Sequence, residues 1–300
     1  METILITGGS GTIGMALSAA LVTKNYAVHH LSRSVSENSK YPTFKWDIKE
    51  GSIDPKAFEN VTYIIHLAGE NVGGGRWTKE RKNRIRSSRI DSLELLLNNL
   101  PDNKKLKALI SASGISIYGT LTSEQIFTEE DAFGSDFLAQ VSVDWEAAAD
   151  TFKSAADRIV KIRTGVVLNK DEGALAKIIQ PIKLGVGSPL GTGNQYMPWI
   201  HLDDIVGVYI KAIEDKNING AYNAVASEHA TNRQLTKTVA KILGKSLWAP
   251  KVPSFTLALL FGDMADIILK GSRIDNQKIK DAGYSFKFDS LEDALRDLLD

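Results

Sequence analysis

A cluster of glycines near the N-terminus is the first segment whose residue types could do chemistry. The stretch LITGGSGTIGMAL, residues 5–17, joins an apolar run to a helix-forming segment. Gly8, Gly11 and Gly14 follow the spacing T-G-x-x-G-x-x-G. In a strand-to-helix turn, such glycines allow the tight turn, a close approach of the backbone to a diphosphate, and close packing of helix on strand. The spacing therefore predicts a dinucleotide site, with a purely structural turn as the alternative.

The start of the following helix should supply the contacts to phosphate. Free N–H groups and a partial positive charge attract anions there, and the hydroxyls of Ser10 and Thr12 could add donors. No Lys-Ser/Thr pair follows the loop, which argues against a nucleotide triphosphatase. The residues predicted to hold the diphosphate are Gly8, Ser10, Gly11, Thr12, Ile13 and Gly14.

The residues about 20 positions further on indicate which dinucleotide binds. An NAD site usually carries Asp or Glu at the end of the second strand, whereas this chain has Ser32 and Arg33 in VHHLSRS. A guanidinium suits a 2′-phosphate, so NADP(H) is predicted. The alternative is that Arg33 is an ordinary exposed arginine. Asp47 could accept from the adenine amino group, although a surface role explains it almost as well.

Composition excludes several classes of protein. The 300 residues contain 36 Lys+Arg and 36 Asp+Glu, so no net charge favours nucleic acid or an acidic membrane. There is no cysteine, hence no disulfide and no thiolate metal site. No segment reaches the roughly 18–20 apolar residues of a membrane span. We expect a cytoplasmic protein that binds a small-molecule substrate and no nucleic acid, membrane or metal. The composition is compatible with a homodimer.

The elements that must position these residues alternate along the chain. Short runs rich in β-branched residues, such as TILIT, AVHHLS, YIIHLAG, LKALISAS and RIVKIRTGVVL, are separated by stretches with helical spacing, including 15–24, 87–100 and 143–156. This alternation predicts an α/β fold with a Rossmann-like doubly wound parallel sheet. We expect a cofactor domain over 1–247, with substrate-cleft insertions from about residue 169, and a small helical substrate-side domain over 248–300.

Several motifs make a family resemblance specific. The glycine loop, HLAG, SASGISIYG, RTGVVL and WIHLDD together resemble the extended short-chain dehydrogenase/reductase superfamily, in its nucleotide-sugar epimerase branch. LAGENVGGGRWTKERKNRIRSSRIDS, DFLAQVSVDWE and VPSFTLALLFGDMADIILKG add a closer resemblance to atypical epimerase-family proteins with a small C-terminal domain of unknown function. The resemblance covers nearly the whole chain.

The resemblance implies further cofactor contacts. Residues 67–69 should line the ribose and nicotinamide side, two residues of the subgroup's own signature should face the same cleft, and the end of the sixth strand should pass near the nicotinamide. These residues are Leu67, Ala68, Gly69, Glu70, Arg76, Arg163, Gly165 and Val166.

The catalytic pattern of the superfamily is incomplete here. Typical members use Ser, Tyr and Lys, with Tyr and Lys four apart on one helix so that both face the cofactor. Ser113 matches the serine. Aligned on Glu146, the helix that should supply the other two has Leu138 in place of Tyr and Ser142 in place of Lys. The usual proton relay is therefore missing from that helix.

Three interpretations follow from this gap. Tyr118 could act as a substitute acid, although packing a strand-end turn explains it better. The cleft could bind NADP(H) without turnover, as a regulatory or redox-sensing module. Alternatively, Glu70 and Arg76, with Lys82 and Arg89, could polarise a carbonyl or bind an anion.

The run RWTKERKNRIRSSR, residues 76–89, bears on the third interpretation. It holds seven basic residues and one acid, which favours anion binding over a solvated helix face. The favoured function overall is an NADP(H)-dependent, epimerase-like oxidoreductase acting on an unidentified small molecule, which could be nucleotide-sugar-like. A non-catalytic NADP(H)-binding protein is the alternative.

Overall fold

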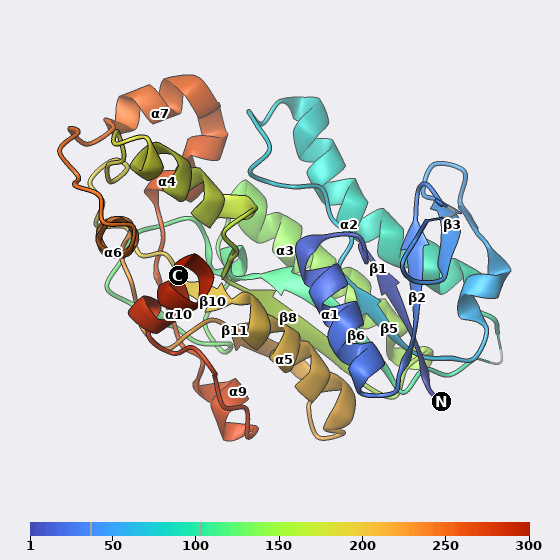
Figure 1. Cartoon of the computed structure of the whole chain (residues 1–300). Coiled ribbons are helices and arrows are strands. Elements are labelled where there is room, and N and C mark those ends of the chain that lie inside the picture. The colour runs from blue at the N-terminus through green and yellow to red at the C-terminus, as the bar shows by residue number, and fades with distance from the viewer. Residues whose placement is uncertain (37, 103) are drawn as a thin grey trace.

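The computed structural model describes residues 1–36, 38–102 and 104–300. Its centre is an eight-stranded sheet in the order β11-β8-β6-β5-β1-β2-β3-β4 (Figure 1). All neighbouring strands are parallel except β3 and β4. The bounds of these strands are β1 Thr3–Thr7, β2 Ala27–Ser32, β3 Thr43–Asp47, β4 Ser52–Ile53, β5 Val61–His66, β6 Ala108–Gly114, β8 Ile159–Thr164 and β11 Gly220–Ala224.

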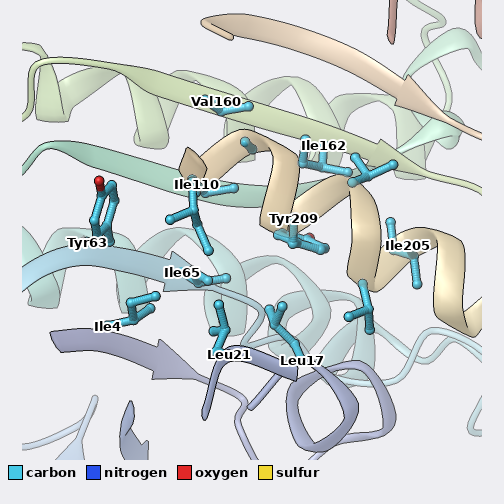
Figure 2. Close-up of a cluster of buried hydrophobic side chains, with 14 of the residues drawn as sticks. Ile4, Leu17, Leu21, Tyr63, Ile65, Ile110, Val160, Ile162, Ile205 and Tyr209 are labelled. Atoms are coloured by element: carbon cyan, nitrogen blue, oxygen red, sulfur yellow. The ribbon is translucent and has the colours of Figure 1, made fainter. Parts of the chain in front are cut away.

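Helices cover both faces of the sheet (Figure 1). Side chains alternate across a strand, so Ile4 and Ile6 face one side while Leu5 faces the other. Ile4 and Ile6 pack with the helices α1 (Thr12–Thr23) and α5 (Leu202–Glu214), the cluster drawn in Figure 2. Leu5 packs with α2 (Lys79–Asn99) and α3 (Phe137–Asp150). The chain therefore has the three-layer, doubly wound α/β fold predicted from the alternating strand and helix signals.

The direction of winding reverses at β1. That strand pairs with β2 on one side, Thr7 opposite Leu31, and with β5 on the other, Thr7 opposite His66. In open parallel sheets, ligands bind in the crevice beyond the carboxyl ends of the strands at this reversal. The glycine loop after β1 and the LAG segment after β5 meet there.

Two helices begin earlier than their apolar periodicity predicts. Helix α2 starts at Lys79 because the Thr78 hydroxyl accepts from the Arg81 N–H, and α3 starts at Phe137 because Asp136 caps its first turn. Such caps satisfy backbone donors that have no partner within the helix. The polar first turns carry no apolar stripe, so the spacing of apolar residues alone places both starts too late.

The C-terminal third supplies a second core. Helices α4 (Gly173–Lys183), α6 (Asn232–Ile242) and α10 (Leu291–Leu299) bury Leu175, Leu235 and Leu295 in one cluster. The predicted boundary at 247/248 therefore divides segments that share a hydrophobic interior. The remaining elements are β7 Ile126–Phe127, β9 Val166–Leu168, β10 Trp199–His201, α7 Ser254–Phe261, α8 Asp266–Leu269, β12 Arg273–Ile274 and α9 Gln277–Asp281, with single 3₁₀ turns at Pro55–Phe58, Ile115–Tyr118, Thr151–Ser154 and Gly262–Ala265.

None of the helices in the described ranges combines the length and apolarity that crossing a bilayer requires.

Candidate functional site

A cleft of about 390 Å³ lies at the reversal of the sheet. Its walls come from the glycine loop, from the segment after β5 and from the stretch that joins β9 to α4. Seven of its lining residues are predicted cofactor contacts: Gly8, Gly11, Thr12, Ile13, Gly14, Leu67 and Gly69. The other five are Asn71, Val167, Asn169, Glu172 and Gly173.

The glycines of the loop are required by geometry that the structure shows directly. Gly8 has φ +68°, and a Cβ there would lie 2.9 Å from the backbone of Leu67. A Cβ on Gly14 would lie 2.5 Å from the carbonyl oxygen of Gly8. Gly11 is different, because its Cβ would meet only that same oxygen at 3.4 Å. Two glycines thus serve the fold of the loop, while the third leaves its backbone bare toward the cleft.

The first turn of α1 is open to a ligand. Gly11 is the N-cap and offers no side chain to the helix N–H groups. Beneath the loop, His30 packs where a Cβ on Gly9 would stand, and its Nε2 lies 2.7 Å from Ser18 Oγ. Burial lowers the pKa of His30 to about 4, so this ring is uncharged at neutral pH. His30 therefore adds no positive charge at the loop, and the start of the helix contributes its partial positive charge.

The residues predicted to read the adenosine end lie at the neighbouring strand ends. Arg33 is exposed directly after β2, and none of the described residues is hydrogen-bonded or ion-paired with its side chain. Ser32 accepts from the N–H of Ser34 at 3.4 Å. Asp47 accepts from the N–H groups of Lys49 and Glu50, which lower the pKa of its carboxyl. Arg33 remains available to a phosphate, whereas Asp47 holds a turn.

The candidate catalytic serine lies in a buried network. Ser113 Oγ, 4% exposed as a residue, donates to Glu146 Oε1 at 2.8 Å. The Arg163 guanidinium binds both oxygens of the same carboxylate, at 2.8 and 3.0 Å. Burial alone would lower the pKa of Arg163, but its bonds to Glu146 raise it above its ordinary value. Arg163, which stays a predicted neighbour of the nicotinamide, neutralises Glu146 inside the protein.

Tyr118 belongs to the same network. Its hydroxyl donates to Asn223 Oδ1 at 2.7 Å and accepts from Arg163 at 2.9 Å, and the residue is 2% exposed. Burial raises the pKa of Tyr118 to about 12. A phenol held in this way does not face the cleft, so the geometry gives no support to the predicted role as a substitute acid and fits the packing alternative.

The helix expected to carry Tyr and Lys confirms where the relay is lost. Leu138 and Ser142 lie on the buried face of α3, and Ser142 Oγ is 3.0 Å from Ser116 Oγ. The chain does contain the spacing Tyr-x-x-x-Lys at Tyr41 and Lys45. That pair lies in the loop before β3 and in the strand itself, so it cannot place two side chains on one helix face.

The basic run 76–89 finds acidic partners outside its own sequence. Arg81 pairs with Glu70 at 3.4 Å, Lys82 with Asp263 at 2.6 Å, and Arg86 with Asp144 at 2.8 Å. Ion pairs therefore engage three of the seven basic side chains of the run, which is fewer than half.

Two other arginines of the run, Arg76 and Arg89, lie against backbone atoms elsewhere in the protein. Arg89 donates to the carbonyls of Ile85 and Glu70. Arg76 is exposed and lies against Gly262 in the C-terminal segment. Neither Glu70 nor Arg76 is among the described residues that line the cleft.

Four further predicted contacts, Ser10, Ala68, Gly165 and Val166, are not among the residues that line the cleft. The N–H of Ala68 donates to Thr7 Oγ1 at 3.1 Å, which ties the LAG segment to β1. A Cβ on Gly165 would lie 2.8 Å from the carbonyl oxygen of Pro198, so this glycine serves strand packing. Val166 pairs with Trp199 in a small sheet. Ser10 is exposed on the glycine loop.

Sequence reasoning missed Glu172, Gly173 and Asn169. The available signal was a polar turn that ends in glycine, NKDEG at 169–173. Its position over the glycine loop depends on the path of the chain and cannot be predicted from the turn itself. No group of three or more acidic or histidine side chains suited to a metal occurs within the described ranges.

The crossover, the bare helix terminus and the glycine geometry define a Rossmann-type nucleotide-binding protein. Comparison of the sequence makes the assignment more specific. The chain matches the NAD dependent epimerase/dehydratase family over residues 4–224 and a domain of unknown function (DUF1731) over residues 252–298. It therefore belongs to the NAD dependent epimerase/dehydratase family.

Individual relatives agree with this membership. Epimerase family protein YfhF of Bacillus subtilis is 34% identical over 299 residues, which cover 99% of this chain and 97% of that protein. The crystal structure of human epimerase family protein SDR39U1 with NADPH superimposes with a TM-score of 0.88 at 29% identity, covering 99% and 98% of the two chains. A nucleoside-diphosphate sugar epimerase from Corynebacterium glutamicum aligns with a TM-score of 0.79 at 28% identity, over 99% of this chain and 58% of that one.

Proposed function

We propose that the cleft binds NADP(H). The single observation that carries this proposal is the meeting of the glycine loop, the uncapped start of α1 and the LAG segment in one cleft at the sheet reversal. A bound dinucleotide would lay its diphosphate on the N–H groups around Gly11 and Thr12. The human relative crystallised with NADPH supports the choice of cofactor.

The preference for the 2′-phosphate is proposed to come from Arg33. Its exposed guanidinium follows β2, where an acidic residue would bind the ribose of NAD. NADPH should bind more tightly than NADH, and Arg33→Asp should reverse that order. Titration calorimetry with both dinucleotides measures this. Equal affinities in the wild-type protein would refute the assignment of Arg33.

For activity, we propose an epimerase-like oxidoreductase whose cofactor supplies hydride transfer to a small molecule, with nucleotide sugars as the first class to test. The relative named as a nucleoside-diphosphate sugar epimerase supports that choice. Loss of NADPH absorbance should be followed against a panel of nucleotide sugars and small carbonyl compounds, and epimerisation by chromatography. If Ser113 takes part, Ser113→Ala should abolish turnover and leave NADPH affinity unchanged.

A second candidate function is supported by a specific observation. Ser113 and Tyr118 are both engaged in buried hydrogen bonds, and α3 lacks the Tyr/Lys pair. Such a cleft suits a protein that binds NADP(H) and responds to it without turnover. Tight NADPH binding with no conversion across the panel would favour this second function over the first.

A further inference from the structure

The cleft contains an acidic side chain where an anionic cofactor would bind. Glu172 lines the cleft together with the glycine loop, and its Oε2 accepts a hydrogen bond from Thr12 Oγ1. These residues are 160 positions apart in the chain. The segment between β9 and α4 thus reaches across the opening to the first turn of α1.

The contact places the Glu172 carboxylate at the start of α1, where a cofactor diphosphate would bind. Thr12 is the first residue of α1, and a carboxylate near this positive end of the helix dipole is stabilised. The same terminus and hydroxyl would stabilise a diphosphate. A carboxylate and a diphosphate a few ångströms apart repel each other, so both cannot keep Thr12 as a partner.

The surroundings of Glu172 allow the carboxylate to leave. The side chain is exposed, and the next residue, Gly173, has φ +74° with nothing within 4 Å of a Cβ built on it. Behind this glycine, Lys177 anchors α4 through a bond of 2.9 Å to the carbonyl of Gly73. The movement can therefore be confined to the loop before Gly173, while the helix stays in place.

We infer that Glu172 competes with the cofactor's diphosphate for Thr12 and the start of α1, and so sets the affinity of the cleft for NADP(H). This inference rests on the proposed function, because it requires a dinucleotide in the cleft. It makes Glu172 an affinity-determining residue that swings away when the cofactor binds. Removing its charge should strengthen binding.

The test compares NADPH dissociation constants, measured by calorimetry on the full-length chain at low ionic strength. Glu172→Gln keeps the size and polarity of the side chain and should bind NADPH about three- to fivefold more tightly, as expected for one charge at an exposed helix terminus. Asp171→Asn is the matched control, since it removes the same charge one residue away. That control should change affinity by less than about 1.5-fold, an effect of net charge alone.

Each outcome separates the two claims. A gain for Glu172→Gln that Asp171→Asn lacks, and that shrinks at high salt, supports the competition. Weaker NADPH binding by Glu172→Gln would mean that the carboxylate accepts a hydrogen bond from the cofactor. Equal gains in both variants would mean that any lost negative charge near the cleft strengthens binding. Either result overturns the inference and leaves NADPH binding itself intact. If neither the wild-type protein nor any variant binds NADPH, the proposed function itself fails.

Discussion

Two regions along the carboxyl edge of the same sheet differ in whether their polar groups face a cleft. After β1, the glycine loop presents bare backbone at Gly11 and the half-buried Thr12, whose hydroxyl donates to Glu172, to a cleft. Within the last residues of β6 and β8, Ser113 and Arg163 are buried and bonded to Glu146. The glycine loop is thus open to a cleft that could hold a ligand. The side chains of Ser113 and Arg163 are instead engaged in buried hydrogen bonds that stabilise the protein.

The contrast between the glycine loop and the network around Glu146 separates the residues suited to ligand binding from those expected to do catalysis. The glycine loop has the spacing T-G-x-x-G-x-x-G, whereas α3 has Leu138 and Ser142 where Tyr and Lys are expected from the family resemblance. Buried polar networks are costly when broken, because each remaining member loses a partner away from water. Changes in the network around Glu146 should therefore reduce stability, and changes in the glycine loop should reduce NADPH binding.

The largest effect is expected for Glu146→Gln. It leaves the Arg163 guanidinium buried without a counter-charge, which should lower the free energy of unfolding by about 3 kcal/mol. Urea denaturation measures the change. The control is Asp144→Asn on the same helix, which breaks an exposed pair with Arg86 and should cost less than about 1 kcal/mol. Similar values for the two variants would contradict a structural role for the network.

Tyr118→Phe should have the next largest effect. The change removes the hydroxyl that donates to Asn223 and accepts from Arg163 in the interior. The loss of these two hydrogen bonds should lower the free energy of unfolding by about 2 kcal/mol. NADPH affinity should stay within about twofold of wild type, the margin expected for a site away from the change. If Tyr118→Phe instead folds with full stability but loses turnover on an identified substrate, the phenol reaches the reacting atoms and the contrast is broken.

Gly11→Ala sharpens the other side of the comparison. Gly11 has φ −79° and only an ordinary contact at its Cβ position, so the fold should lose less than about 1 kcal/mol. NADPH affinity should nevertheless fall at least about tenfold, because the methyl group occupies the space of the diphosphate. Gly14→Ala is the comparison variant, since its Cβ would clash within the loop and should reduce stability as well. Unchanged affinity in Gly11→Ala would refute a close approach of the cofactor.

The smallest effect concerns pH. Burial lowers the pKa of His30 to about 4 and that of His66 to about 3, below the ordinary value of 6.5. The unfolded chain therefore binds more protons than the native protein in this range, and stability is full above pH 6.5 and falls as the pH drops toward these values. Between pH 7 and pH 6, each histidine should cost about 0.5–1 kcal/mol.

Denaturation curves at the two pH values, repeated for His30→Gln, test this expectation. The variant should lose the part of the pH dependence of the unfolding free energy that His30 contributes, and keep the part that His66 contributes. A native protein whose stability does not change over this interval would show that these rings are protonated without cost.

The success of sequence reasoning follows the same division. The glycine loop and the alternation of strands and helices were predictable because they depend on local spacing and on apolar patterning, as at Ile4 and Ile6. The fate of Arg163 was not, because its partner Glu146 lies on another element and only packing brings them together. Glu172 escaped prediction for the same reason, since 160 residues separate it from Thr12.

The shared interior of the C-terminal third has a consequence for the cleft. Leu295 of the last helix packs in the same cluster as Leu175, two residues after the glycine that opens α4. Truncating Leu295 should therefore loosen the packing beneath the turn at Gly173, which lines the cleft. A substitution about 120 positions along the chain from Leu175 could in this way change the shape of the cleft.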